Sequence, residues 1–492
     1  MYRLVVYYLL LLVSVALLFS LFGLLPYNPF SLLFSTLFLV GVSWLANKVF
    51  SKTFNAPTNV ESVYISALIL ALIISPAKSI TDVVFLFWAA VLTMGSKYMF
   101  AIAKKHVFNP VAIAVTMTSL VAVGSASWWV GTGVMMPFVL LGLLIVRKTR
   151  RTDLVFYFFI GAIFTIFGFS LMQGSNLMTT LKNMLLSSSL FFFAFVMLTE
   201  PLTTPPTKKL QTFYGIIVGI LFAPQFHLGT FFTTPETALV IGNMFAYFVS
   251  PKYKVITTLR QKLQTAPNMM DFLFVPQKKI AFLPGQYMEW TLPHPKTDSR
   301  GNRRYFTIAS SPTEDTLRLG VRFNANGSSF KKALLNMDTT TQIVGAQVGG
   351  DFTLPKDPKE KLVFIAGGIG ITPFRSMIKY LVDLKQPRQI VQFYANKTVD
   401  EVIYYDVFNQ AQAELGIRTV YTLTDTTRIP QQWTGRIGRI DAAMIQQEVP
   451  DFKERTFYLS GPHSMVVSYE KALQALGVAE KRIKKDFFPG FA

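Results

Sequence analysis

The sequence of 492 residues predicts a polytopic α-helical membrane domain followed by an antiparallel β-barrel and an α/β domain with a parallel sheet. Long apolar runs fill residues 1–251, short alternating segments fill residues 252–357, and strands alternate with helices over residues 358–492. Charged residues make up only 15% of the chain, and apolar residues make up 51%. Since soluble proteins carry about 25% charged residues, part of this chain is expected to lie in lipid.

The membrane domain is predicted from apolar runs close to the roughly 20 residues that cross a bilayer. Ten runs meet this description, and because several are short, nine spans would fit the sequence as well. The first run is too long for the core of a signal peptide and lacks a small-residue cleavage site, so it is expected to remain as a helix. The ten runs lie near residues 4–25, 31–47, 60–75, 83–103, 109–124, 128–146, 153–172, 183–199, 211–224 and 237–250.

Basic residues lie mostly on one side of this predicted domain. With the N-terminus inside, the outer loops hold little that is basic beyond Lys78 and Lys182. This asymmetry follows the positive-inside rule and predicts a multi-pass protein of the cell (inner) membrane whose C-terminal half faces the cytoplasm. The basic residues of the inner loops are Lys48, Lys52, Lys104, Lys105, Arg147, Lys148, Arg150, Arg151, Lys208, Lys209, Lys252 and Lys254.

The overall composition excludes several classes of protein. Lys and Arg number 47 against 27 Asp and Glu, which gives a formal net charge of +20. No nucleic-acid partner is expected, because the basic residues flank membrane segments and do not form one stripe. The chain has no Cys, which excludes disulfides, thiolate zinc sites, Cys nucleophiles and Cys-bound iron–sulfur clusters. With only four His, no metal site is predicted, and redox chemistry is expected to rest on organic cofactors.

Two polar features lie within the apolar half. Lys97 falls inside the fourth run, where an unpaired ammonium costs at least about 2.5 kcal/mol. Its side chain either extends toward the inner membrane surface or binds an anionic group or cofactor. Asn109 and Pro110 open the fifth run. The proline either only begins a helix, or it leaves helix N-terminal amides available to an anionic group.

Strand and turn signals define the two soluble domains. Alternating segments at 272–275, 287–291 and 317–323 predict the antiparallel barrel. The apolar strand 362–366 leads into a glycine-rich turn at residues 367–373 (GGIGITP) and then into a helix. Glycines at such a turn let a pyrophosphate approach the backbone, and the helix N-terminus supplies amides, so the turn predicts a nucleotide site.

One further strand carries side chains suited to a flavin nucleotide. Arg304 and Phe306 share one face of this strand, and Tyr305 and Thr307 share the other. A guanidinium can pair bidentately with a phosphate, and a planar ring can cover an isoalloxazine. Taken alone, the same four residues are equally typical of a half-buried strand.

Several motifs in a fixed order resemble the ferredoxin–NADP reductase superfamily. The resemblance covers about residues 255–492 and implies an NAD(P)H-dependent oxidoreductase with an FAD-binding barrel and an NAD(P)H-binding domain. The motifs are Pro284-Gly285-Gln286-Tyr287, Arg304-x-Phe306-Thr307, Gly327-Ser328-Ser329, Gly367-Gly368-x-Gly370-x-Thr372-Pro373 and Ser460-Gly461-Pro462-x-x-Met465.

The same resemblance implies roles for individual residues. The FAD diphosphate would be held by Arg304 with Gly327, Ser328 and Ser329, and the flavin ring by Tyr305, Phe306 and Thr307, with Phe306 stacked on it and Thr307 near N5. The nicotinamide nucleotide would be held by Gly367, Gly368, Gly370, Thr372, Gly461 and Pro462. The residues expected at the reacting rings are Thr307, Ser460 and Phe491. Phe306 stands where many relatives have Tyr, and Ser460 where many have Cys.

The apolar half resembles the B subunit of the sodium-pumping NADH:quinone oxidoreductase and the D subunit of the Rnf complex. This resemblance rests on the segments 96–98 (SKY), 105–110 (KHVFNP) and 199–207 (TEPLTTPPT). It implies FMN or riboflavin in the membrane domain, with Lys97 and Asn109 as binding residues and one FMN esterified to a Thr near the outer face. The equivalent residue is Thr179, in a predicted outer loop. The Ser-Gly-Ala lead-in is replaced by Asn-Leu-Met, so an unmodified threonine is equally open.

Together these features predict a membrane-bound oxidoreductase that passes electrons from cytoplasmic NAD(P)H through FAD into a flavin-binding membrane domain. The expected acceptor is a quinone or an extracytoplasmic flavin or redox protein. Three alternatives stay open: a redox-driven ion transporter, a haem-type transmembrane reductase, and a membrane half that only anchors the reductase. Only His106 and His227 lie in the apolar half, which excludes a pair of bis-His haems. The choice between NADH and NADPH also stays open, with Lys397 as a possible partner of a 2′-phosphate.

Overall fold

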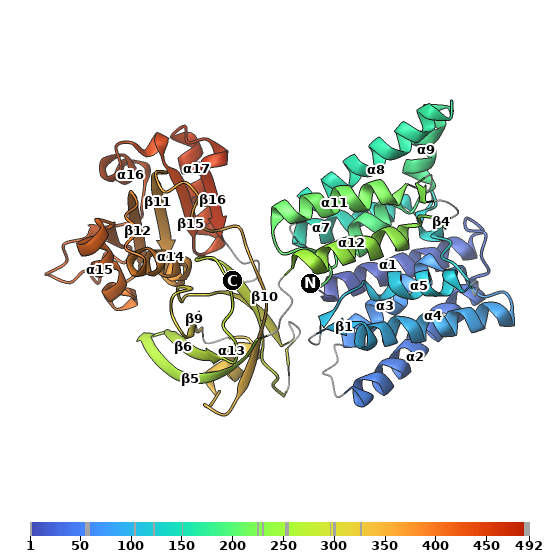
Figure 1. Ribbon diagram of the computed structural model, residues 1–492, viewed down its shortest axis with the longest axis horizontal. Coiled ribbons are helices and arrows are strands. Elements are labelled where there is room, and N and C mark those ends of the chain that lie inside the picture. Colours follow the sequence, from blue (N-terminus) through green and yellow to red (C-terminus); the bar gives the residue numbers. More distant parts are fainter. Residues whose placement is uncertain are drawn as a thin grey trace. The chain divides into compact units, whose positions relative to one another are not determined.

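The computed structural model describes residues 2–54, 60–102, 105–121, 124–149, 151–223, 226–228, 231–250, 255–295, 297–298, 302–324 and 327–486. The chain divides into two compact units, Met1–Lys252 and Tyr253–Ala492. The first unit is helical, and the second contains two β-sheets with their covering helices (Figure 1).

Four helices in the described part of the first unit are long and apolar enough to cross a membrane. They are α1 (Tyr2–Leu21), α2 (Pro29–Thr53), α4 (Ile80–Met99) and α8 (Thr152–Met172). A fifth span is possible if α9 (Leu177–Leu186) and the helical segment Leu190–Met197, which are bent by 53°, form one crossing. The described residues therefore contain four or five helices of spanning length, and the expected ten spans are not shown.

The remaining apolar runs form shorter helices. Two of these helices are α3 (Val60–Ile73) and α5 (Pro110–Leu120). Two others, α11 (Lys208–Phe222) and α12 (Pro235–Val249), have 15 residues each. A straight 15-residue helix is about 22 Å long, which is short of the roughly 30 Å of hydrocarbon. Helices α11 and α12 are therefore too short to be counted with the four helices of spanning length.

The run at 128–146 is broken, although the sequence predicts one span there. It contains η1 (Trp129–Gly131), α6 (Met136–Val139), η2 (Leu140–Gly142) and α7 (Leu143–Thr149). The breaks occur where glycines pack directly on a neighbouring segment. A Cβ on Gly131 would collide with the carbonyl of Ser188, and one on Gly142 would lie 3.0 Å from the Phe195 Cβ.

The neighbouring run at 183–199 is also broken. The end of α9 is followed by three serines, residues 187–189, then by α10 (Leu190–Phe192) and the π-helix η3 (Phe193–Met197). Such π-helical turns are rare and often mark functional sites. Thr179, expected in a loop, lies instead in the first turn of α9, whose N-cap is Asn176. The Thr179 backbone amide donates to Asn176 Oδ1 at 3.1 Å.

Glycines also bring α8 and α11 into close contact. A Cβ on Gly161 would lie 2.8 Å from the Ile216 carbonyl oxygen, and one on Gly215 would lie 2.6 Å from that of Leu154. Small residues are what allow helix backbones to approach this closely in a membrane, where no hydrophobic force drives helices together.

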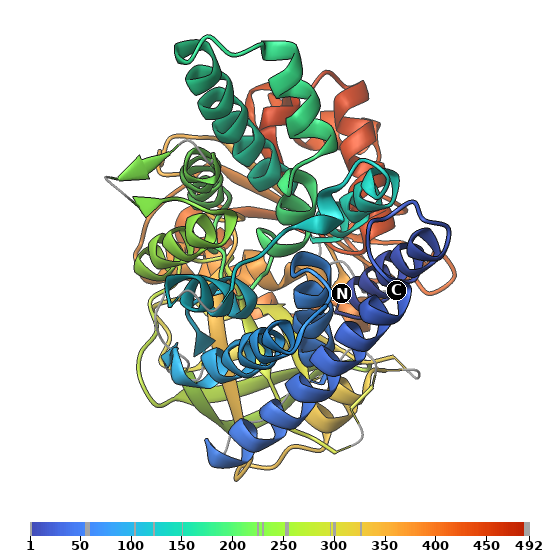
Figure 2. The ribbon, with the colours of Figure 1, turned by 90° about the vertical axis from the view of Figure 1, so that its right-hand side faces the viewer.

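Helices α8 and α9, which follow each other in the chain, also lie side by side in both views (Figures 1 and 2).

The first sheet of the second unit is antiparallel throughout. Its strands are β5 (Val255–Ala266), β6 (Met269–Pro276), β7 (Tyr287–Thr291), β8 (Arg303–Thr307), β9 (Leu317–Arg322) and β10 (Gln342–Gly349), in the order β8-β7-β10-β5-β6-β9. Its core contains Phe272, Phe274 and Trp290, together with Phe330 from α13 (Ser329–Leu335). The alternating segments of the sequence therefore form an antiparallel sheet, as expected, with β8 and β9 as its two end strands.

The second sheet is parallel. Its strands are β11 (Leu362–Gly367), β12 (Ile390–Asn396), β13 (Arg418–Leu423), β14 (Arg436–Ile437), β15 (Thr456–Ser460) and β16 (Ile483–Asp486), in the order β14-β13-β12-β11-β15-β16. Four helices accompany it, α14 (Thr372–Asp383), α15 (Tyr405–Leu415), α16 (Ala442–Glu448) and α17 (His463–Ala475).

Helices cover both faces of this sheet. On β11, Leu362, Phe364 and Ala366 pack into a core shared with α14 and α15. The alternate residues Val363 and Ile365 pack into a second core with α16 and α17. Every residue of β11 is buried, which explains why its sequence is a continuous apolar run and not an alternating one.

Candidate cofactor-binding site

The chain order of the parallel strands reverses between β11 and β15. Successive strands lead from β11 outward through β12 and β13 on one side, while β15 and β16 lie on the other. In open α/β sheets, the crevice at such a reversal, outside the carboxyl ends of the strands, is where ligands bind. The glycine turn follows β11, and Ser460, Gly461 and Pro462 follow β15, so both predicted motifs meet at this position.

The glycines of the turn are required by close contacts. A Cβ on Gly370 would lie 2.5 Å from the Ser460 carbonyl oxygen and 2.6 Å from the Gly461 Cα. A Cβ on Gly367 would collide with the sulfur of Met465 on α17. Gly368 has a φ of +52°, a left-handed conformation that favours glycine. The glycine turn therefore packs directly against the β15 loop, and it has no side chains between its backbone and the crevice at these glycines.

Helix α14 begins immediately after the turn. Thr372 is its first residue and Pro373 stands at its N-terminus, where a proline sacrifices no backbone hydrogen bond. The Thr372 hydroxyl donates to the Ile369 carbonyl at 3.2 Å. On the neighbouring strand, the Ser460 hydroxyl lies 3.5 Å from Asp486 Oδ2 and the residue is buried. Both predicted residues are thus placed at the mouth of the crevice.

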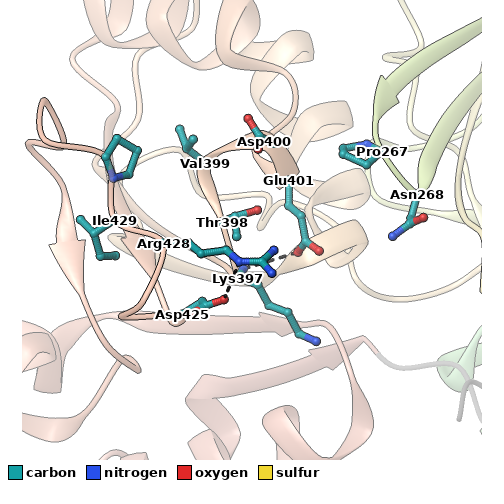
Figure 3. Close-up of a pocket in the computed structure, with 11 residues that line it drawn as sticks. Pro267, Asn268, Lys397, Thr398, Val399, Asp400, Glu401, Asp425, Arg428 and Ile429 are labelled. Carbon is teal, nitrogen blue, oxygen red and sulfur yellow. Dashed lines mark hydrogen bonds and ion pairs between the residues drawn. The ribbon is translucent and has the colours of Figure 1, made fainter.

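A cleft of about 440 Å³ lies at the carboxyl ends of β12 and β13 (Figure 3). Its lining contains two cations, Lys397 and Arg428, and three carboxylates, Asp400, Glu401 and Asp425. Each of these residues follows the end of a parallel strand. The sequence analysis singled out Lys397 alone, although the position of the acids directly after β12 and β13 was the available signal.

Several of these charges are paired. Arg428 Nε lies 3.8 Å from Asp425 Oδ2, and Glu401 Oε1 accepts from Arg322 Nη2 at 3.0 Å. Arg322 ends strand β9 of the antiparallel sheet, and Asn268 from the same sheet also lines the cleft. The cleft therefore lies where the two sheets of the second unit meet, and its lining carries one more negative charge than positive.

On the antiparallel sheet, β8 presents the predicted flavin motif. Phe306 is buried, and its ring centroid lies 5.9 Å from that of Phe330. The Arg304 guanidinium lies 5.4 Å from the same Phe330 ring, so Arg304 and Phe306 share one face as expected. Tyr305 points to the other face, where its hydroxyl donates to Glu289 Oε2 at 2.8 Å. Thr307 ends the strand and is buried.

The predicted diphosphate-binding residues are joined by an internal carboxylate. Asp298 Oδ1 lies 3.4 Å from Arg304 Nη2, and Asp298 Oδ2 accepts from the Ser329 amide at 3.0 Å. Ser328 caps α13 by accepting from the Lys331 amide, and Gly327 precedes it. Arg304 and the Ser329 amide already bind one anionic group, the Asp298 carboxylate. The same donors are suited to the phosphate oxygens of FAD. The residues present therefore fit the diphosphate of this cofactor.

A buried charge cluster joins the two sheets of the second unit. Arg375 on α14 donates from Nη1 to Glu314 Oε2 at 2.8 Å and from Nη2 to Glu314 Oε1 at 2.9 Å. Asp271 on β6 accepts from Arg318 at 2.7 Å and from the Tyr404 hydroxyl at 2.7 Å. None of these residues could be predicted from the sequence, because the partners lie up to 133 positions apart.

Burial and charge act in opposite directions on these carboxyl groups. Burial opposes ionisation of Glu314, but the hydrogen bonds and charge of Arg375 outweigh it and hold the pKa of this carboxyl below its ordinary value. Burial raises the pKa of Asp271, against the charge of Arg318 and the hydrogen bond from Tyr404. The cluster therefore fixes the start of α14 against the antiparallel sheet through directional bonds.

The predicted polar residues of the helical unit also have partners. Asn109 Nδ2 donates to Glu200 Oε2 at 2.8 Å, and His106 Nε2 lies 3.2 Å from Glu200 Oε1. The backbone amide of Asn109 donates to Asn243 Oδ1 at 2.7 Å. Asn109 Oδ1 accepts from the amides of Val111 and Ala112, so two N-terminal amides of α5 are satisfied within the chain.

Lys97 and Thr179 lie on two other helices of the unit, α4 and α9. Lys97 Nζ donates to the carbonyl oxygen and the hydroxyl of Ser62 on α3, at 3.0 and 3.1 Å. Thr179 is exposed on the first turn of α9. The side chain of His227 and the whole of Phe491 lie outside the described residues.

Comparison with known proteins agrees with this geometry for the second unit. Residues 364–471 match the oxidoreductase NAD-binding domain. This segment begins on β11 and ends on α17, so it contains the glycine turn, the β15 loop and the cleft residues that follow β12 and β13. The expected resemblance of the C-terminal half to NAD-binding reductases is therefore confirmed.

Curated relatives match the same half of the chain. The reductase subunit Stc4 of stachydrine N-demethylase from Rhizobium meliloti is 27% identical over 46% of this chain and 65% of its own length. A flavohemoprotein from Oceanobacillus iheyensis is 23% identical over 48% of this chain and 58% of its own. The F subunit of the Na(+)-translocating NADH-quinone reductase from Serratia proteamaculans is 33% identical over 29% of this chain and 35% of its own.

Among solved structures, the Amycolatopsis cytochrome P450 reductase GcoB aligns with a TM-score of 0.43 and 23% identity, covering 48% of this chain and 69% of that chain.

The chain spans about three fifths of the length of the first two curated relatives. The expected resemblance of the apolar half to membrane subunits of ion-pumping reductases is not shown by these comparisons.

Proposed function

We propose that this protein is a membrane-bound flavoprotein oxidoreductase. In this proposal it passes electrons from cytoplasmic NAD(P)H through FAD into a flavin-binding membrane domain, and on to a membrane or extracytoplasmic acceptor. The observation that carries the proposal is the contact of Gly370 with Ser460 and Gly461, which builds a nucleotide crevice beside the sheet that bears Arg304 and Phe306. FAD, when bound, accepts a hydride from a reduced nicotinamide and passes its electrons on one at a time.

The residues of the second unit act by binding and positioning. The bare backbone at Gly367, Gly368 and Gly370 admits the diphosphate of NAD(P)H, and the cleft beyond β12 and β13 takes its adenosine end. The bidentate pair of Arg375 and Glu314 fixes α14, and with it the glycine turn, against the antiparallel sheet. This fixed arrangement aligns the nicotinamide with the flavin and limits the water at the reacting rings.

In the helical unit we propose a second flavin, FMN or riboflavin, with Lys97 and Asn109 among the binding residues. Exposure of Thr179 on α9 supports it as an attachment site for covalent FMN. The absence of Cys from the sequence favours a flavin over a Cys-bound cluster as the next electron carrier. The Serratia relative is a subunit of an NADH-quinone reductase, which supports a quinone as the acceptor.

The proposal places the helical unit in the cell (inner) membrane as a multi-pass domain, with the reductase domains in the cytoplasm. The basic residues at the predicted inner loops support this orientation. Helices α1, α2, α4 and α8 support insertion by their length and apolar composition. The lipid bilayer is then a partner of the chain, and no nucleic acid is.

A second candidate function is redox-driven ion transport. The group of Glu200, His106, Asn109 and Asn243 supports it, because ionisable residues inside a membrane domain often mark ion or proton paths. Sodium dependence of turnover in proteoliposomes separates the two candidates. Turnover that is independent of sodium and generates no ion gradient supports electron transfer alone.

Two variants test the proposed function. Arg304→Ala removes the cation expected at the FAD diphosphate, so the purified variant should lose most of its FAD, and full yellow colour would refute the assignment.

Lys97→Met should leave NAD(P)H oxidation by ferricyanide intact while quinone reduction in liposomes falls severalfold. Lys182→Met, which removes an exposed Lys of α9, is the matched control. Equal quinone reduction in the Lys97 and Lys182 variants would argue against a flavin at Lys97.

A further inference from the structure

The carboxylate of Asp298 joins two elements of the flavin motif, Arg304 on β8 and Ser329 at the start of α13. Its Oδ2 accepts from the Ser329 amide at 3.0 Å, and its Oδ1 lies 3.4 Å from Arg304 Nη2. The Asp298 amide in turn donates to the Ser329 hydroxyl at 2.9 Å, so the two residues exchange hydrogen bonds. His294 Nε2 lies 3.0 Å from the same hydroxyl. Asp298 is therefore built into this group of residues and is not a stray surface charge.

Burial makes these contacts stronger than an exposed ion pair. The side chain of Arg304 is 15% exposed and that of Asp298 is 26% exposed. Ion pairs on the open surface contribute about 0–1 kcal/mol, whereas charge-assisted hydrogen bonds in partly buried sites are roughly twice as strong as neutral ones. An anion that arrives at these donors must therefore compete with a bound group of the chain itself.

The Ser329 amide cannot serve two anions at once. A backbone amide has one hydrogen to donate, and the Ser329 amide gives it to Asp298. Arg304 Nη1 already donates to the Arg303 carbonyl oxygen at 2.6 Å. A phosphate oxygen that binds the Ser329 amide must displace the carboxylate from that amide, and if the carboxylate stays nearby it repels the phosphates.

We propose that Asp298 is an intramolecular competitor for the diphosphate of FAD, and that this residue sets the affinity of the protein for its flavin. The inference rests on the proposed function, in which Arg304 and Ser329 hold that diphosphate. It predicts that removing the Asp298 charge tightens the binding of FAD. Loss of an ordinary structural ion pair would instead leave the affinity unchanged or weaken it.

The test measures flavin binding to the full chain in detergent after its FAD has been removed by dialysis against potassium bromide. Wild type, Asp298→Asn and Asp298→Ala are titrated with FAD and, separately, with riboflavin, which lacks the phosphates. Asp315→Asn is the matched control, since Asp315 is an exposed acid between β8 and β9 and its substitution makes the same change in net charge.

We expect the FAD dissociation constant to fall roughly tenfold in both Asp298 variants, and to stay unchanged in the Asp315 variant. Salt should weaken FAD binding more steeply in the Asp298 variants, because Arg304 then meets the phosphates without an internal counter-ion. Riboflavin affinity should be the same in all four proteins.

Three outcomes would overturn the inference. FAD affinity could be unchanged or weaker in both Asp298 variants, it could rise equally in the Asp315 variant, or riboflavin affinity could rise together with FAD affinity. Failure of the wild-type protein to bind FAD at all would overturn the proposed function itself. The FAD titration of wild type therefore distinguishes the two failures.

Discussion

Arg375 binds Glu314 through both terminal nitrogens of its guanidinium, at 2.8 and 2.9 Å. Arg375 lies on the helix that follows the glycine turn, and Glu314 lies between β8 and β9 of the antiparallel sheet. The Arg375 side chain is only 4% exposed, so the pair is screened little by water. This pair links the site predicted for the nicotinamide to the sheet predicted to hold the flavin.

Replacing Arg375 should destabilise the second unit. Arg375→Met leaves the Glu314 carboxylate partly buried without its cation, which costs about 3 kcal/mol. The thermal unfolding midpoint of the full chain in detergent, followed by intrinsic fluorescence, should fall by several degrees. Arg428→Met, which breaks the exposed pair with Asp425, is the control and should shift the midpoint little. A shift no larger than that of the control would show that the Arg375 pair contributes little.

The contribution of this pair should depend on pH in a defined direction. Because the pKa of Glu314 is lowered in the folded protein, the stabilisation is fully present above the ordinary value of 4.5. It is lost as the pH falls through the lower, folded value. The difference in unfolding midpoint between wild type and Arg375→Met should be constant from about pH 7 to 5 and shrink below about pH 4. A difference that grows on acidification would contradict the assignment.

The close packing of Gly370 gives a prediction on coenzyme binding. In Gly370→Ala the new Cβ would lie 2.5 Å from the Ser460 carbonyl oxygen, so the turn must move away from the β15 loop. The KM for NAD(P)H with ferricyanide as acceptor should rise at least about tenfold, which corresponds to about 1.4 kcal/mol of lost binding. Gly168→Ala, where nothing lies within 4 Å, is the matched control. An unchanged KM in the Gly370 variant would remove the turn from the coenzyme site.

The acids of the cleft predict a preference for NADH. The 2′-phosphate of NADPH would meet Asp400, Glu401 and Asp425, and only two cations, Lys397 and Arg428, share that lining. Asp425→Ser keeps a side-chain oxygen that can accept a hydrogen bond in the turn after β13, but it removes one negative charge. The ratio of kcat/KM for NADPH to that for NADH should rise about tenfold. A ratio that stays the same, or that changes equally in Asp315→Ser, would place the 2′ position elsewhere.

The sequence predicted those parts of the fold that depend on local patterns. Period-two alternation located β6, β7 and β9, and the apolar run before the glycines located β11. The glycine turn and the β15 loop were both recognised, and the structure brings them into contact at Gly370 and Ser460. These features are readable because a strand or a tight turn imposes its requirement on consecutive residues.

Features that depend on tertiary contacts could not be predicted in the same way. Apolar composition did not show that residues 128–146 are broken, because the breaks come from the packing of Gly131 and Gly142 on a distant segment. The links from Arg375 to Glu314 and from Asp271 to Tyr404 join residues 61 and 133 positions apart. Asp298 gave no signal either, since an acid in a polar loop is ordinary until its partners are known.

In the proposed function, a reductase module that binds FAD and NAD(P)H delivers electrons to a flavin in the fused helical unit. The most direct measurement is an optical spectrum of the purified full chain, combined with flavin extraction and a count of FAD and FMN or riboflavin per chain. The account predicts one extractable FAD, a second flavin in the helical unit, and bleaching of both on addition of NADH. A colourless protein that takes up no flavin on reconstitution, or a single FAD whose reduction never reaches a second centre, would contradict it.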